Sequence, residues 1–217
     1  MPHFRQIFEP RTYAFAYLLA DTDKREAVLI DPAAGQATLY LALLDELQAQ
    51  LTQVLLTHSH EAHAGAAAEL CRATGALCVA SGRAGILGVD VPVDDHAVIP
   101  FGDEVLRCRA TPGHTPGCIS YLWRDRAFTG DALMIGDCGA AGTGDAGLLF
   151  DSVTRKLLTL PDETLVYPAH DFAGRHVSSI GEQREGNPRF AGITRDEFIA
   201  KLAQPDPSRY AGAAAPT

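Results

Sequence analysis

Three histidines at short spacing are the residues of this 217-residue sequence best suited to chemistry. They are His58, His60 and His63, in the segment His-Ser-His-Glu-Ala-His. At the end of an extended strand, residues i and i+2 project to the same side, so His58 and His60 can converge. His63 would lie in the first turn of a following helix and face back toward them. Because imidazole is a common ligand of zinc and iron, the segment predicts a metal site, with structural or surface histidines as the alternative.

Two more histidines and a carboxylate lie in turns or where strands are expected to end. His114 stands in the turn Thr-Pro-Gly-His-Thr-Pro-Gly, whose prolines and glycines restrict the backbone. Asp131 follows an apolar run in Thr-Gly-Asp, and His170 follows another in Tyr-Pro-Ala-His-Asp. Each of these residues alone is a weak signal. Together with the three clustered histidines they indicate one metal centre assembled from distant segments.

The apolar pattern shows which elements must position these residues. Strands are expected at 15–19, 27–30, 54–56, 77–80, 98–99, 105–109, 119–123, 127–129 and 165–167, and helices at 35–50, 62–74 and 151–160. On the first helix, a single face is expected to carry Leu39, Leu43, Leu44, Leu47 and Leu51. Gly75 is expected to close the second helix. This alternation predicts an α/β fold of layered sheets and helices.

Length and composition limit the domain number and the classes of partner. The length predicts one domain, residues 1–204, followed by a disordered tail at 205–217 that is rich in Ala and Pro. The net charge of 18 − 27 = −9 would repel both nucleic acid and an anionic membrane. No apolar run approaches the about 18 residues of a membrane-spanning helix. We therefore expect neither nucleic acid nor membrane as a partner, and a homodimer is left open.

Cysteine use and the first residues bear on the compartment. The five cysteines form no C-x-x-C pair, and their odd number argues against a disulfide framework. The N-terminal residues lack the basic and apolar regions of a secretory signal. These features favour the cytoplasm, or the mitochondrial matrix if the source is eukaryotic.

The ordered motifs T-H-x-H-x-x-H, P-G-H-T-P-G, T-G-D-A and Y-P-A-H-D resemble those of the metallo-β-lactamase fold superfamily. This resemblance implies an αββα four-layer sandwich with its metal site at the sheet edge. A closer similarity is to the persulfide dioxygenases, also called sulfur dioxygenases. It is carried by phrases at residues 4–10, 17–21, 27–32, 138–139, 167–171 and 187–189, and it extends over about residues 4–190.

In the persulfide dioxygenases one Fe(2+) is held by two histidines and one aspartate. At the matching positions of this sequence these are His58, His114 and Asp131, so the resemblance implies one iron per chain and names these as the catalytic metal ligands. Such a set leaves open positions suited to non-haem iron and dioxygen. The resemblance also implies a group of residues that orient the ligands or line the pocket: His60, His63, His170, Cys138, Phe172 and Arg175.

Three positions depart from the family pattern. The residue before His63 is Ala62, where superfamily hydrolases with two zinc ions have a metal-binding aspartate. Glu61 is a less suitable substitute, since one position along a helix rotates the side chain by about 100°. After Cys138 and Gly139 the usual Arg-Thr-Asp is missing, which removes an arginine for the carboxylate of glutathione. Phe172 also stands where a tyrosine is usual.

The leading hypothesis is therefore a mononuclear non-haem iron dioxygenase of sulfur metabolism. It would oxidise a low-molecular-weight thiol persulfide, such as glutathione persulfide, with O2 to sulfite and free thiol. One alternative is a metal-dependent thioester hydrolase of the glyoxalase II type, against which Ala62 and the 47 residues after His170 both count. Another is a catalytically weak sulfur-binding homologue, which the missing Arg-Thr-Asp motivates.

Overall fold

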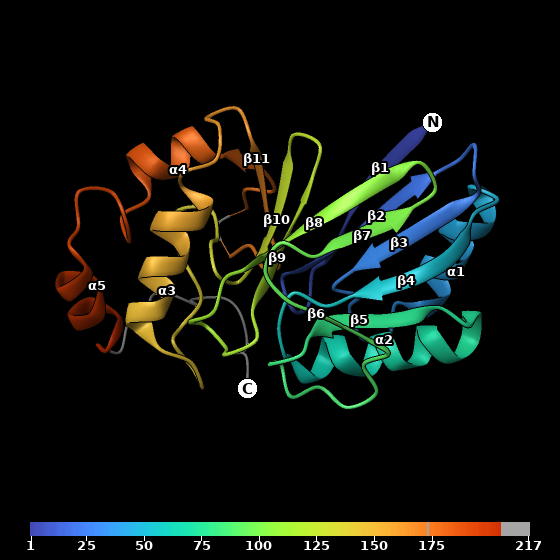
Figure 1. The fold of residues 1–217 in the computed structure, drawn as a ribbon, viewed down its shortest axis with the longest axis horizontal. Helices are drawn as coiled ribbons and strands as arrows, with labels where there is room; N and C mark the ends of the chain where they lie inside the picture. The colour runs from blue at the N-terminus through green and yellow to red at the C-terminus, as the bar shows by residue number, and fades with distance from the viewer. Residues whose placement is uncertain (173, 205–217) are drawn as a thin grey trace.

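Two mixed β-sheets lie face to face in the computed structural model, with helices on both outer faces (Figure 1). The structure describes residues 1–172 and 174–204. The predicted α/β fold with αββα layers is confirmed. The tail predicted at 205–217 lies outside the described residues.

The first sheet has the strand order β1-β2-β3-β4-β5-β6. Strands β1, β2 and β3 pair antiparallel, and β3 to β6 pair parallel. Their bounds are β1 Pro2–Glu9, β2 Ala14–Asp21, β3 Glu26–Ile30, β4 Gln50–Leu55, β5 Leu77–Ser81 and β6 Val91–Val93. The parallel part follows the β-α-β pattern expected around residues 54–80, and it places the ends of β3 and β4 at one edge.

The second sheet has the strand order β12-β11-β10-β9-β8-β7. Its strands are β7 Val98–Phe101, β8 Glu104–Ala110, β9 Ile119–Trp123, β10 Arg126–Gly130, β11 Leu165–Pro168 and β12 Ser178–Ser179. Only β10 and β11 pair parallel, so their ends also meet at one edge. Both hairpins expected from the sequence are present, at β7–β8 and at β9–β10.

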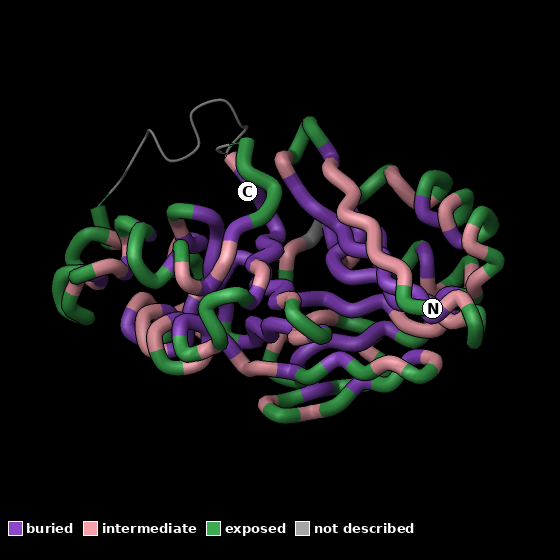
Figure 2. Tube along the Cα trace, turned by 90° about the horizontal axis from the view of Figure 1, so that it is seen from above, coloured by how far each residue is buried: buried purple, intermediate pink, exposed green. Residues whose placement is uncertain are grey.

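Three hydrophobic clusters hold the four layers together. One lies between the sheets, one between the first sheet and its helices, and one between the second sheet and its helices. The helices are α1 Ala37–Glu46, α2 Glu61–Thr74, α3 Ala146–Ser152, the π-helical turn η1 Val153–Leu157, α4 Ile180–Gly186 and α5 Arg195–Leu202. Figure 2 shows the buried positions along the central strands and the exposed positions on the outer helices. No helix of the described residues is long and apolar enough to cross a membrane.

Two helix predictions need correction. Helix α1 ends at Glu46, since Gln48 takes a left-handed φ of 51° that reverses the chain, and Leu51 belongs to β4. The buried face of α1 carries Tyr40 and Leu44, whereas Leu39 is exposed. The helix expected at 151–160 begins at Ala146, because the side chain of Asp145 accepts a hydrogen bond from the Leu148 N–H and caps it. The prediction for α2 and its closing Gly75, which has φ 78°, is confirmed.

Candidate metal centre

The strand ends of both sheets meet at the predicted site. His58 follows β4, Asp131 follows β10, and His170 follows β11. The amide of Ile119, at the start of β9, donates to the Thr57 carbonyl at 2.7 Å and joins the two sheets at this edge. Gly130 permits this approach, because a Cβ there would lie 2.7 Å from Thr57 Oγ1.

Three side chains turn their ligand atoms toward one point. Those of His58, His114 and Asp131 all lie within 4.8 Å of one another. Nε2 of His58 is 3.6 Å and Nε2 of His114 is 3.7 Å from Oδ2 of Asp131. His58 and Asp131 are buried, and His114 is partly exposed. The structure therefore brings together the three residues expected to hold the metal.

Hydrogen bonds at Nδ1 orient the imidazoles. His114 Nδ1 donates to the Ala140 carbonyl at 2.6 Å, and His63 Nδ1 donates to the Pro32 carbonyl at 3.0 Å. Each of these bonds places the ring proton on Nδ1, which leaves Nε2 with a free lone pair. The tautomer that binds metal through Nε2 is thus selected by the backbone around the site.

His58 is oriented by a link that the sequence did not point out. The Thr57 hydroxyl donates to Oδ2 of Asp31 at 2.6 Å, so it can accept from Nδ1 of His58 at 2.8 Å. Oδ1 of Asp31 also accepts the Thr57 amide at 2.8 Å. Asp31 is buried, and it has a left-handed φ of 48° at the end of β3. The sequence feature that could have indicated this link is an aspartate, Asp31, directly after the apolar strand β3, which pairs parallel with β4.

His60, His63 and His170 form a second group beside the first. Their ring centroids lie 5.2 to 5.9 Å apart. His170 Nδ1 donates to Asp131 at 2.8 Å, so Asp131 contacts both groups. In the described residues neither ring nitrogen of His60, nor Nε2 of His63, has a hydrogen-bond partner. The nitrogens of His60 can therefore still donate or accept a hydrogen bond, and Nε2 of His63, whose ring proton is on Nδ1, can accept one.

Burial and mutual charge set the protonation of the site. Burial lowers the pKa of His58 well below its ordinary value and that of His60 to about 4. Burial alone would raise the pKa of Asp131, but the imidazoles of His170, His58 and His114 outweigh it and hold that pKa well below its ordinary value. Burial lowers the pKa of His170, yet the Asp131 carboxylate raises it above the usual value. At neutral pH the centre therefore offers neutral His58 and ionised Asp131, the forms that bind metals.

A metal ion fits this donor set. Nε2 of His58 is buried without a hydrogen-bond partner in the described part of the chain, and such a group is costly unless something binds it. Two imidazoles and one carboxylate that converge on one point are the set used for non-haem iron. Ala62, in the first turn of α2, supplies no ligand atom, so a second metal would lack the usual carboxylate.

The loop after β10 supports His114. Gly139 donates to the Asp131 carbonyl at 2.6 Å, and a Cβ at Gly139 would lie 2.7 Å from Nδ1 of His114. Ala140 then provides the carbonyl that accepts from this histidine. The stretch that lacks the Arg-Thr-Asp of the family thus still orients His114. Cys138 precedes it and is fully buried in the cluster beneath α3.

The remaining residues predicted for the pocket lie farther out. The ring of Phe172 stacks on that of His170, with centroids 5.8 Å apart and an interplanar angle of 4°. Arg175 makes a bidentate pair with Glu182 on the surface. Its positive charge is therefore already matched by a carboxylate. Phe172 covers His170 with an apolar face where the family usually has a hydroxyl.

Known proteins resemble this chain over most of its length. The sequence profile of the metallo-beta-lactamase superfamily matches residues 10–83 and 77–170. Human mitochondrial persulfide dioxygenase ETHE1 is 42% identical over 200 residues, which cover 90% of this chain and 78% of that protein. A hydroxyacylglutathione hydrolase from a Polaromonas species is 41% identical over 165 residues, covering 73% and 62%. The crystal structure of ETHE1 from Myxococcus xanthus superposes with a TM-score of 0.90 at 43% identity, covering 97% and 96%.

Proposed function

The chain belongs to the persulfide dioxygenase family of the metallo-beta-lactamase superfamily, and from this membership we propose that it is a mononuclear iron enzyme that oxidises a low-molecular-weight thiol persulfide. Persulfide, dioxygen and water would give thiol, sulfite and two protons. The observation that carries the proposal is the convergence of His58, His114 and Asp131. Glutathione persulfide is one candidate substrate among several.

Each residue of the centre has a task in this proposal. His58, His114 and Asp131 would hold Fe(2+), which when bound supplies open positions where persulfide and dioxygen can meet. Asp131 also accepts from His170, which keeps the carboxylate oriented toward the ligand histidines. The buried nitrogens of His60 and His63 that have no hydrogen-bond partner in the described residues would bind polar parts of the substrate. Phe172 covers His170 and helps to exclude water.

The experiment is an oxygen-electrode assay of protein loaded with iron under anaerobic conditions, together with elemental analysis. We expect about one iron per chain and oxygen uptake with at least one of several persulfides. His114→Ala and Asp131→Ala should lose both the metal and the uptake. His3→Ala, on β1 of the first sheet, is the matched control and should keep both. An absence of uptake with every persulfide, at one bound iron per chain, would contradict the proposal.

A thioester hydrolase with two zinc ions is the rival. The histidine group His60, His63 and His170 and the hydrolase relative favour it. Ala62 counts against it, and so does the coverage, since the hydrolase relative aligns with 73% of this chain and human ETHE1 with 90%. The same preparation separates the two proposals. About two zinc per chain with thioester hydrolysis and no oxygen uptake would favour the hydrolase.

A further inference from the structure

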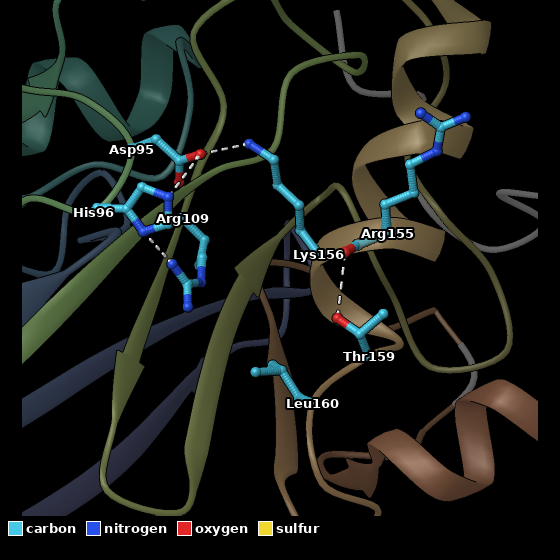
Figure 3. Close-up of a pocket in the computed structure, with 7 residues that line it drawn as sticks. All are labelled: Asp95, His96, Arg109, Arg155, Lys156, Thr159 and Leu160. Atoms are coloured by element: carbon cyan, nitrogen blue, oxygen red, sulfur yellow. Dashed lines mark hydrogen bonds and ion pairs between the residues drawn. The ribbon is translucent and has the colours of Figure 1, made fainter.

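A second group of polar side chains lies outside the metal centre, around a cavity of about 330 Å³. The cavity is open to solvent on one side and is lined by the turn before β7, by β8, and by η1 with the residues that follow it. Figure 3 shows Asp95 and His96 from the turn, Arg109 from β8, and Lys156 from η1. None of these residues belongs to the metal centre, and the proposed dioxygenase reaction uses none of them.

Two hydrogen bonds fix the Lys156 ammonium group and leave one of its N–H donors unused. Its Nζ donates to Oδ2 of Asp95 at 2.7 Å and to the carbonyl of Ala110 at 2.8 Å. The side chain is 35% exposed. An ammonium group has three donors, so a third N–H remains for a molecule in the cavity. Asp95 also accepts the Ala110 amide at 3.0 Å, which fixes the carboxylate that holds the lysine.

Arg109 brings a charge that no carboxylate of the described residues matches. Its guanidinium donates to Nδ1 of His96, whose left-handed φ of 64° sets the direction of the ring. Nε2 of His96 in turn lies 3.7 Å from Asp95. A guanidinium has five N–H donors, and this contact uses one of them. The other four donors have no protein partner among the described residues, and Arg109 lines the cavity together with Lys156.

The π-helical turn η1 carries the two basic residues Arg155 and Lys156, which line the cavity. Its Leu158 amide reaches back to the Val153 carbonyl at 2.8 Å, the wider spacing of a π turn. Such turns occur often at functional sites. The turn carries Arg155 beside Lys156, and Arg155 also lines the cavity while pairing with Asp151 at 3.3 Å.

The local charge is opposite to that of the whole chain. Arg109 and Lys156 carry two positive charges against the single carboxylate of Asp95, in a protein with a net charge of −9. A guanidinium and an ammonium that line the same cavity suit the oxygens of a phosphate. The volume is near the lower end of small-molecule sites, which leaves room for more than a bare anion. We propose that this cavity binds a phosphate group, free or carried by a small organic molecule, through Arg109 and Lys156.

Calorimetric titration of the metal-loaded protein tests this proposal. We expect saturable binding of inorganic phosphate or of glycerol 3-phosphate, but not of chloride at equal ionic strength. Tighter binding of glycerol 3-phosphate would identify an organic phosphate as the source, and tighter binding of inorganic phosphate would identify the free anion. Arg109→Gln and Lys156→Gln should each weaken binding about tenfold, as expected for the loss of one hydrogen bond to a charged group.

Arg107→Gln is the matched control. Leu106 and Cys108 are buried, so Arg107 and Arg109 project from the same outer face of β8, but Arg107 does not line the cavity. This variant should bind phosphate like the unaltered protein. Phosphate bound at the iron would not respond to Arg109→Gln, so the comparison separates the two sites. Absent saturable binding, or equal losses in Arg107→Gln and Arg109→Gln, would overturn the proposal.

Discussion

At the scale of single residues, the geometry of the candidate metal centre depends on groups that are not among the candidate ligands. The Thr57 hydroxyl connects buried Asp31 to Nδ1 of His58. Backbone carbonyls accept hydrogen bonds from Nδ1 of His63 and of His114. These bonds fix which nitrogen of each ring carries the proton. On the premise of the proposed function, affinity for iron should therefore depend on the hydrogen-bond partners of the histidines as well as on the histidines themselves.

Replacing Thr57 by valine tests this dependence. The valine keeps the branched shape but removes the hydroxyl, so His58 loses its orienting acceptor. We expect iron affinity to fall about 10- to 100-fold, the usual effect of losing such a partner. Competition with a chelator measures the affinity, and circular dichroism checks the fold. Thr52→Val in β4, whose hydroxyl donates to the Ala27 carbonyl at 3.1 Å, is the control. Equal affinities in the two variants would show that the hydroxyl has no such role.

Arg175 offers a second test at this scale, on the premise of the proposed function. Because Glu182 already pairs with its guanidinium, Arg175 has little free charge to offer an acidic persulfide. We expect Arg175→Gln to change KM for glutathione persulfide by less than about fivefold, in the range of an exposed ion pair. Steady-state oxygen uptake gives KM. A much larger rise that is confined to anionic persulfides would place Arg175 among the substrate contacts.

At the scale of elements, helix α3 supports the turn that carries His114. The Asp145 amide donates to the Gly113 carbonyl at 2.9 Å, and the Ser152 hydroxyl donates to the Pro112 carbonyl at 2.7 Å. Gly113 has a φ of 141°, and a Cβ there would lie 2.2 Å from backbone atoms of Leu149 in α3. Only glycine allows the turn and the helix to approach this closely.

Gly113→Ala should therefore displace the turn and reduce iron binding. The strained backbone alone costs about 1–3 kcal/mol, and the contact with Leu149 adds to this. Iron content and the midpoint of urea unfolding should both fall. Gly35→Ala provides the comparison, because Gly35 also has a positive φ, 75°, but its Cβ would meet no atom within 4 Å. That variant should lose some stability and keep its iron; full iron content in Gly113→Ala would contradict the role given to α3.

The elements differ in how far the sequence could predict them. The buried strands and the histidine motifs were recognised because apolar runs and fixed spacing are local features. Strand β1 was not predicted, since most of its residues are half-buried and it lies at a sheet edge. The capping of α3 by Asp145 was also missed. The link from Asp31 through Thr57 to His58 depends on the parallel pairing of β3 and β4, which brings together residues 26 positions apart.

At the scale of the whole molecule, the two sheets are joined at both ends. At the metal centre, Ile119 bonds to Thr57, and Phe15 bonds to Ala169. At the opposite end, the turn between β7 and β8 rests on carboxylates of the first sheet. Asp21 accepts the Asp103 amide at 2.9 Å, and Glu26 accepts the Gly102 amide at 2.8 Å. No residue of this second connection belongs to the candidate metal centre, and its carboxylates should make a contribution to stability that depends on pH.

The pKa of Asp21 allows the effect of acid on this connection to be measured. The hydrogen bond from the Asp103 amide, with others from Lys24 and Asp23, lowers the pKa of Asp21 from 3.8 to about 2. A carboxyl whose pKa is lower in the folded state stabilises the fold above its unfolded pKa, and this stability is lost as the pH falls toward the folded value. Asp21→Asn should therefore be less stable than the unaltered protein at neutral pH, and the difference should shrink between pH 4 and pH 2.

Urea unfolding midpoints across this pH range give that difference directly. On the premise of the proposed function, any loss of iron in acid should weaken both proteins alike and so cancel in the comparison. Asp45→Asn, an exposed position on α1, makes the same change of charge without the bonds to the turn and should track the unaltered protein. A gap between Asp21→Asn and the unaltered protein that stays constant with pH would mean that the carboxylate charge does not hold the sheets together. A difference that disappears toward pH 2 would show that the ionised Asp21 carboxylate stabilises this end of the sandwich.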